Sequence, residues 1–198
     1  MQKIIKQGQN NNITKLNLNY EGHKEGEEQV ESYLKIVEDK IGFIPNVLAA
    51  FAKFPKQFEG FTKLYNSLML GESGLTKLER EMIAVTVSSE NHCFYCLVAH
   101  GSAVRELSND PQLGERIAAN FRSAELPRRQ EELLSFAKKL TKDPSEIGEQ
   151  ERKKLRDVGY TDRDIWDISA IVGFFNMTNR LASAIEMEPN NNYHNIAR

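Results

Sequence analysis

The stretch that decides the fold is residues 81–100, EMIAVTVSSENHCFYCLVAH. Apolar residues at helical spacing predict a helix over about 76–87. The four polar residues at 88–91 compete for backbone hydrogen bonds, and so favour a turn followed by a helix N-cap. A second helix is therefore expected to start near His92, with Cys93 in its first turn.

The same periodicity extends along most of the chain. From Glu27, apolar side chains recur at i, i+3, i+4 and i+7, and Gly42 stands where a helix C-cap belongs. On the last expected helix, Trp166, Phe174 and Phe175 are read as core residues. Because strand signals are nearly absent, we expect an all-α fold, a single-domain helical bundle. Further helices are expected over about 46–54, from Pro55 to 70, and over 111–120, 127–140, 148–158 and 162–186.

A weak internal repeat is visible in the sequence. Gly74-Leu75-Thr76 aligns with Gly159-Tyr160-Thr161 at an offset of 85 residues, and Asn91 then aligns with Asn176. The match fits two related helical halves and fits a fortuitous likeness equally well. Only the first copy carries cysteines.

Three regions are expected along the chain. Residues 1–24 are rich in Asn, Gln and Lys and are read as an extended or disordered arm. Residues 25–188 form the helical domain, and residues 189–198 form a tail that is loose or borrowed by a neighbouring subunit.

Composition excludes several classes of protein. The 198 residues are 40% apolar and 27% charged, with 28 acidic against 26 basic side chains, which is typical of one soluble domain. A net charge of -2 argues against a nucleic-acid surface, which needs clustered Lys and Arg. No apolar run approaches the roughly 20 residues that span a bilayer, and the N-terminus lacks the core of a secretory signal. We therefore expect a cytoplasmic protein that binds neither nucleic acid nor membrane.

The two cysteines and a histidine share one face of the second helix. Cys93 and Cys96 are spaced i, i+3, and His100 follows Cys96 at i+4. A helix N-terminus lowers the pKa of a thiol, and an imidazole one turn away can relay a proton. Glu81, on the preceding helix, would supply a base if the two helices run antiparallel.

Other interpretations of these residues stay open. Isolated cysteines are often small buried hydrophobic residues, and Glu81 alone reads as a solvated helix charge. A Cys-x-x-Cys can be half of a zinc site completed by His100 and His92, although no second knuckle is present. A non-catalytic oligomer whose cysteines sense redox state or bind metal is therefore the alternative function.

The spacing of these residues resembles a known signature. Glu81, eleven residues, then Cys93-x-x-Cys96-x-x-x-His100 is similar to the motif of alkylhydroperoxidase D, within the carboxymuconolactone decarboxylase superfamily. The resemblance covers about residues 30 to 190. Further features look like the subgroup called peroxidase-related enzymes: Gly42 to Asn46, Leu75-Thr76 with Glu79 to Glu81, and Asn176 with Asn179 to Ala182.

This resemblance implies an all-helical antioxidant enzyme that needs no metal, haem or other cofactor and assembles into dimers, trimers or hexamers. Glu81 and His100 would help to ionise Cys96, which would attack a hydroperoxide. The resulting sulfenic acid would condense with Cys93 to a disulfide. A dithiol or thioredoxin-like electron donor would then reduce it.

Two points depart from the family pattern. Alkylhydroperoxidase D has a histidine immediately before the second cysteine, and here that position is Tyr95, whose ordinary pKa of about 10 does not suit a base at neutral pH. The helix terminus favours the thiolate at Cys93, whereas the relay favours Cys96, and we predict Cys96 as the nucleophile. Decarboxylase-like lactone chemistry is a third option, but it has no need of two thiols.

Overall fold

The fold is all-α, as the sequence predicts. The computed structural model describes residues 13–18 and 25–198, and within these ranges the chain forms helices and turns and no strand. None of the helices described is both long and apolar enough to cross a membrane. The elements are α2 (Glu27–Ile41), α3 (Asn46–Phe51), α4 (Pro55–Tyr65), the π-helical η1 (Asn66–Leu70), α5 (Lys77–Glu90), α6 (Phe94–Ser108), α7 (Leu113–Asn120), η2 (Phe121–Ser123), α8 (Arg128–Lys142), η3 (Pro144–Glu146), α9 (Glu149–Asp157), α10 (Asp162–Ala184) and α11 (Asn192–Asn195).

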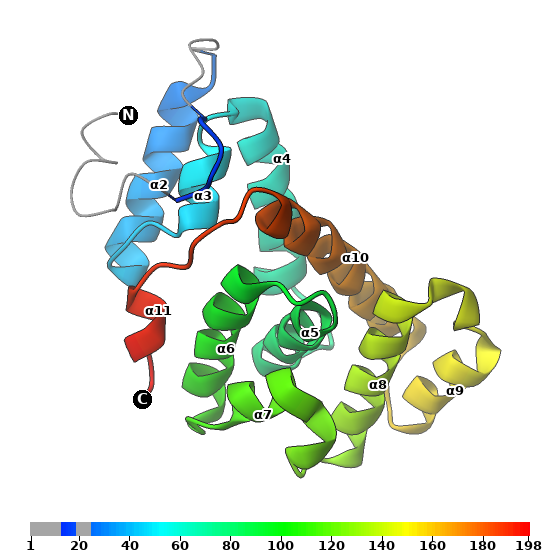
Figure 1. Cartoon of the computed structure of the whole chain (residues 1–198). Coiled ribbons are helices and arrows are strands. Elements are labelled where there is room, and N and C mark those ends of the chain that lie inside the picture. The colour runs from blue at the N-terminus through cyan, green and yellow to red at the C-terminus, as the bar shows by residue number, and fades with distance from the viewer. Residues whose placement is uncertain (1–12, 19–24) are drawn as a thin grey trace.

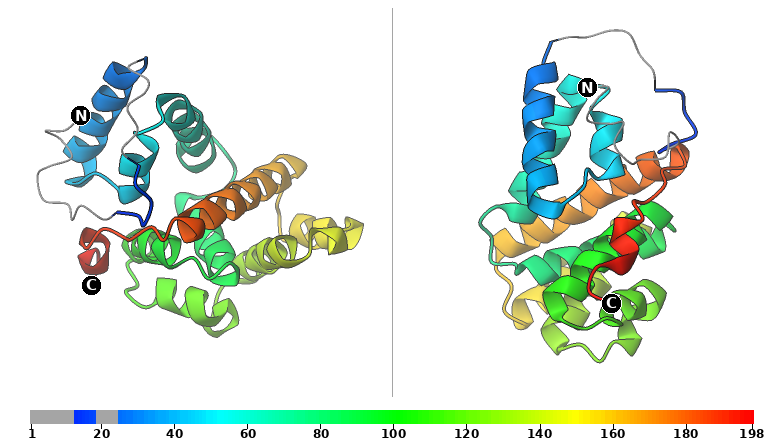
Figure 2. Two further views of the ribbon diagram at one scale, coloured as in Figure 1. Left: turned by 45° about the horizontal axis from the view of Figure 1, so that its top comes forward. Right: turned by 90° about the vertical axis from the view of Figure 1, so that its left-hand side faces the viewer.

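Helix α5 lies at the centre of the bundle and packs against α6, α7, α8 and α10. Four consecutive residues, Met82 to Val85, are fully buried, so the helix is enclosed on every side. Helix α10 runs between α5–α9 on one side and α2–α4 on the other (Figures 1 and 2). The site described below lies where α5, α6 and α10 meet.

One predicted core residue on α10 is wrong. Phe174 and Phe175 are buried, but Trp166 is 71% exposed. The buried stripe of this helix passes through Ile165 and Ile168. Trp166 lies about 100° around the helix from Ile165 and therefore faces away from the core.

Helices α5 and α10 begin in the same way, at positions 85 residues apart. Thr76 caps α5 with Glu79 completing a capping box, and Thr161 caps α10 with Asp164 completing another. The two segments of the weak sequence repeat thus share the same helix start. They differ from residue 91 onward, because α5 ends there and α10 continues through the equivalent position, Asn176.

Helical structure is interrupted between α5 and α6, and we call residues 91–93 the break. Helix α5 continues through most of the turn predicted at 88–91. His92 then adopts the left-handed conformation, with φ 53°, and α6 returns antiparallel along α5. As a result Cys93 is the N-cap of α6 rather than a residue of its first turn. In the second copy, α10 passes through Asn176 as unbroken helix.

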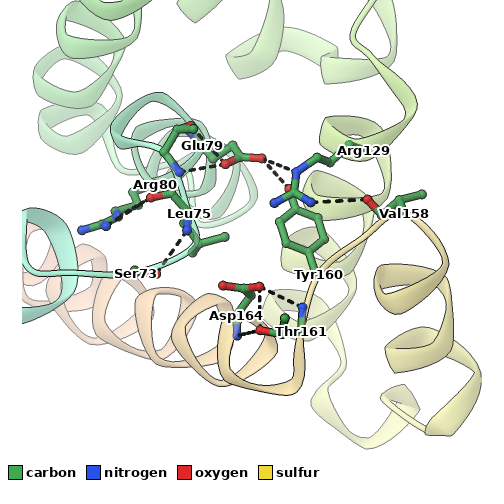
Figure 3. Close-up of polar contacts among 10 residues, drawn as sticks. Ser73, Leu75, Glu79, Arg80, Arg129, Val158, Tyr160, Thr161 and Asp164 are labelled. Atoms are coloured by element: carbon green, nitrogen blue, oxygen red, sulfur yellow. Dashed lines mark hydrogen bonds and ion pairs between the residues drawn. The ribbon is translucent and has the colours of Figure 1, made fainter.

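A buried carboxylate anchors the start of α5 (Figure 3). Glu79 accepts hydrogen bonds from the Tyr160 hydroxyl at 2.7 Å, the Arg129 Nε at 3.1 Å and the Thr76 N–H at 2.8 Å. Burial opposes its ionisation, but these donors hold the pKa of Glu79 below its usual value. The Arg129 guanidinium also lies over the Tyr160 ring, 3.6 Å from its centroid. The network fixes α5 against α8 and the start of α10.

The C-terminal tail lies against its own chain instead of being loose. Arg105 on α6 is buried and donates to the carbonyl oxygens of Tyr193, at 2.8 Å, and Ile196, at 3.1 Å. The Tyr193 ring meets Phe43 edge-on, with centroids 5.1 Å apart. Figure 2 shows α11 beside α6. The tail therefore adds Tyr193 to the surroundings of the cysteine helix.

The loop before α3 holds the segment that leads into the tail. The helix expected over about 46–54 is shorter in the structure, because Pro45 is the N-cap of α3 and α3 ends at Phe51. The Asn46 side chain instead donates to the Glu188 carbonyl, and its N–H donates to the Asn190 side chain, both at 2.7 Å.

Part of the predicted N-terminal arm can be compared with the structure. Lys15 donates its N–H to the Ile185 carbonyl, and Glu188 donates to the Ile13 carbonyl, both at 3.0 Å. Residues 13–18 thus pair with the end of α10, and the rest of the arm predicted over 1–24 lies outside the described residues.

Gly74 lies against the capping box of α10. A methyl group at this position would fall on the carboxylate of Asp164, which is buried and bonded to Thr161. We expect Gly74→Ala to lower the free energy of unfolding by about 1–3 kcal/mol, the usual cost of overpacking, measured by urea denaturation. Gly60→Ala is the control, because nothing lies within 4 Å of its added methyl, and it should be neutral or stabilising by up to about 1 kcal/mol. Equal stability of the two variants would contradict the prediction.

Candidate functional site

The two cysteines open helix α6. Cys93 caps the helix and Cys96 lies one turn later, and both are free thiols that are 1% and 4% exposed. The first N–H groups of a helix point toward its cap and carry partial positive charge, so this position favours a negatively charged sulfur. The structure brings the predicted pair together at the buried end of a helix.

The antiparallel return of α6 along α5 brings Glu81 to His100. The carboxylate Oε2 and the imidazole Nδ1 are 2.6 Å apart, and both side chains are largely buried. Phe175 on α10 packs edge-on against the imidazole, with centroids 4.6 Å apart. The carboxylate and the aromatic ring fix the orientation of His100, and binding at Nδ1 leaves proton exchange to Nε2.

The two thiols shift each other's pKa in opposite directions. A hydrogen bond from Cys96 lowers the pKa of Cys93 to about 6 against the opposing effect of burial, helped by the Cys96 N–H, the Ser183 hydroxyl and the charge of His100. Conversely, the bond to Cys93, burial and the charge on Cys93 raise the pKa of Cys96. The dithiol therefore loses its first proton readily and holds the second one between the two sulfurs.

A buried asparagine network lies behind Cys96, and no role was predicted for it from the sequence. Asn179 of α10 is fully buried and donates to the Ser88 hydroxyl oxygen at 3.0 Å. Asn91, in the break between α5 and α6, donates to the side-chain oxygens of Asn176 and Asn179, at 3.1 and 3.0 Å. The signal in the sequence is the pair of asparagines at i, i+3 directly after the apolar run of residues 170–175.

Tyr95 occupies the position where a relay histidine was expected. Its hydroxyl accepts a hydrogen bond from the Val47 N–H at 3.1 Å and also bonds with Tyr193. Burial raises the pKa of Tyr95 far above its ordinary value, and burial also raises the pKa of Tyr193 to about 12. Both phenols are neutral near pH 7, so neither can serve as a base there.

A cavity of about 290 Å³ reaches the site from the Cys93 side. Phe94 and Met187 supply apolar surface, while Ser183 and Glu186 supply polar groups. Cys93 lines this cavity. Cys93 itself is only 1% exposed, so the cavity borders a buried residue.

The residues proposed for a zinc site are engaged differently. His100 is bound to Glu81, and His92 is an exposed residue that lines the same cavity as Cys93. Among the described residues, no group of three or more His, Cys, Asp or Glu side chains is placed to hold a metal ion.

Comparison with protein families places these residues in context. The model of the carboxymuconolactone decarboxylase family matches residues 55–143, which include α5, the break and α6. A search of curated proteins finds no match.

Solved structures of similar sequence share the whole fold. An uncharacterized peroxidase-related protein from Silicibacter sp. TM1040 is 53% identical, with 94% of this chain and 97% of that chain covered and a TM-score of 0.89. A second one from Ralstonia eutropha JMP134, described as an alkylhydroperoxidase AhpD core, is 41% identical over 86% of this chain and 90% of its own, with a TM-score of 0.84. The debrominase Bmp8 shares the fold alone, at 18% identity, 95% and 97% coverage and a TM-score of 0.73. The chain therefore belongs to the carboxymuconolactone decarboxylase family, among its alkylhydroperoxidase D-like, peroxidase-related members.

Proposed function

We propose that this protein is a thiol-dependent peroxidase that reduces hydroperoxides with Cys93 and Cys96. The observation that carries the proposal is the placement of two free sulfurs at the N-terminus of α6, on the helix whose His100 is bound to Glu81. Similarity to peroxidase-related proteins supports the same class of reaction.

The proposed reaction uses both thiols. One thiolate attacks an oxygen of R–O–O–H, the O–O bond breaks, and the alkoxide leaves as the alcohol after taking a proton. The sulfur becomes a sulfenic acid, and the second thiol displaces its hydroxyl as water while the disulfide forms. The two electrons that reduce the peroxide come from the two sulfurs. A dithiol or thioredoxin-like donor, itself oxidised to a disulfide, restores the thiols.

We propose Cys93 as the attacking sulfur, which reverses the order predicted from the sequence. Two features support this order: Cys93 has the lowered pKa, and it lines the cavity through which a peroxide would arrive. Cys96 does not line the cavity, donates a hydrogen bond to Cys93, and would resolve the sulfenic acid.

The Glu81–His100 pair has a defined role in this scheme. The carboxylate holds the imidazole in place, so that the histidine can receive the proton lost by the thiol pair. The charge of His100 then stabilises the thiolate of Cys93, and the same proton can later be given to the leaving alkoxide.

A cytoplasmic location and a homo-oligomeric state, dimer, trimer or hexamer, are part of the same proposal. The cytoplasm would keep both thiols reduced between turnovers. Native mass measurement of the reduced protein would test the oligomer.

The ionisation of Cys93 gives a pH prediction. Because its pKa is lowered, the thiolate is present above about pH 6 and is lost as the pH falls through that value. We expect the absorbance of the reduced protein at the thiolate band to show one step near pH 6 and peroxide consumption to fall below it. Cys93→Ser should abolish the step. A titration that begins only near pH 8–9, as for a free cysteine, would contradict the prediction.

Thiol counting tests the redox disulfide. One equivalent of peroxide should convert the reduced protein from two free thiols to none, because each turnover oxidises both sulfurs. Cys93→Ser should lose peroxide consumption, whereas Cys96→Ser should consume one equivalent and stop at the sulfenic acid, which dimedone traps. Loss of the first step in Cys96→Ser alone would restore the order predicted from the sequence, and two thiols that persist unchanged would exclude the peroxidase.

Glu81→Gln tests the relay. The amide keeps the shape of the side chain but removes the charge that holds His100, so kcat/KM for peroxide should fall by about 10²-fold, the scale of assisted proton transfer. Glu59→Gln is the control, because Glu59 is an exposed residue paired with Lys63 on α4. Similar activities of the two variants would show that Glu81 is only a structural charge.

A further inference from the structure

Asn179 is the most deeply buried amide at the site. It is fully buried on α10, and the side-chain network fixes its orientation. Asn91 is a donor at its Nδ2, and it donates to the Asn179 Oδ1 at 3.0 Å. The Nδ2 of Asn179 must therefore point the other way, where it donates to the Ser88 hydroxyl oxygen at 3.0 Å.

The orientation of Asn91 is set in turn by Asn176. Arg180 donates to the Asn176 Oδ1 at 2.7 Å, and the Asn176 Nδ2 donates to the Val172 carbonyl at 3.0 Å. Asn176 can thus only accept from Asn91. Every amide in the series has one allowed orientation, and the series ends with donors that face the cysteines.

The sulfur at the end of this network belongs to Cys96. Asn179 donates through its Nδ2 to Ser88, and the Ser88 carbonyl accepts the Cys93 N–H at 3.0 Å, so this pair lies directly beside the cysteines. The Asn179 amide and the Ser88 hydroxyl both act as hydrogen-bond partners of the Cys96 side chain. Two donors on two different helices, α10 and α5, therefore converge on one buried atom.

We propose that Asn179, together with Ser88, is a positioning residue that turns hydrogen-bond donors toward the Cys96 sulfur and so favours its thiolate during disulfide closure. A neutral thiol gains little from two donors, whereas a thiolate accepts both. The role in disulfide closure rests on the proposed peroxidase function, but the stabilisation of the Cys96 thiolate does not.

The donors matter at a particular step. While Cys93 carries the charge, Cys96 keeps its proton, because a second charge beside the first is unfavourable. Once Cys93 has become a neutral sulfenic acid, that repulsion is gone, and Cys96 must lose its proton to attack the Cys93 sulfur and release water. Asn179 and Ser88 then stabilise the attacking charge. If Cys96 attacks the peroxide first, it needs the same thiolate.

The experiment isolates the Cys96 sulfur. In the full-length Cys93→Ser protein, thiolate absorbance against pH gives the ionisation of Cys96 alone. We expect Asn179→Leu, an apolar side chain of similar size, to lower the thiolate fraction in the rising part of that curve by about tenfold, the effect of one lost charge-assisted hydrogen bond. Ser88→Ala should lower it by at least threefold and removes only one oxygen, so it decides the matter if Asn179→Leu fails to fold.

Thr178→Val is the matched control. Thr178 neighbours Asn179 on α10 and is buried, but its hydroxyl bonds the Phe175 carbonyl of its own helix. The control should titrate as the parent does, and in the two-cysteine protein Asn179→Leu should slow disulfide closure after a peroxide pulse. Titration curves for Asn179→Leu and Ser88→Ala that match the parent, or an equal shift in Thr178→Val, would overturn the proposal. A shift without peroxide consumption would support the role of Asn179 and contradict only the proposed activity.

Discussion

The hydrogen bonds from the Asn91 amide to Asn176 and Asn179 hold the turn between α5 and α6 against α10. The turn contains neither glycine nor proline, and it places His92 in a left-handed conformation that only a fixed context maintains. If α5 continued as helix through this point, as α10 does through its counterpart, no helix N-terminus would exist at Cys93. The position of both sulfurs therefore depends on this turn.

Around the turn, each cysteine has its own set of polar groups that lower the pKa of its thiol. The helix terminus and the charge of His100 act on Cys93, while the donors of Ser88 and Asn179 act on Cys96. All of these favour negative charge on sulfur. At Cys96 the hydrogen bond to Cys93, burial and the charge on Cys93 oppose it, and at Cys93 burial opposes it. Because each thiol influences the other, charge on Cys93 raises the pKa of Cys96. In the proposed reaction Cys96 therefore loses its proton only after Cys93 has reacted.

Two helices of the chain, α5 and α10, begin with equivalent capping boxes, but only α5 leads to the cysteines. Thr76 and Thr161 start equivalent helices through equivalent capping boxes, and Glu79 and Asp164 complete them. The first copy ends in a break that creates the helix N-terminus at Cys93. The second copy stays helical, and its asparagines serve as the wall that supports the first.

The sequence alone determined the all-α class, most helix positions and the shared helix face of Cys93, Cys96 and His100, because helical periodicity and i, i+3, i+4 spacing are local. The contact of Glu81 with His100 depended on the antiparallel packing of α5 and α6. It did not determine which face of α10 is buried at Trp166, where α5 ends, or that the tail lies against α6. The role of Asn179 and the cavity beside Cys93 were also decided by tertiary structure, since each joins segments about 85 or more residues apart in the chain. Local spacing fixes which side chains share a helix face, but only packing between helices decides what that face meets.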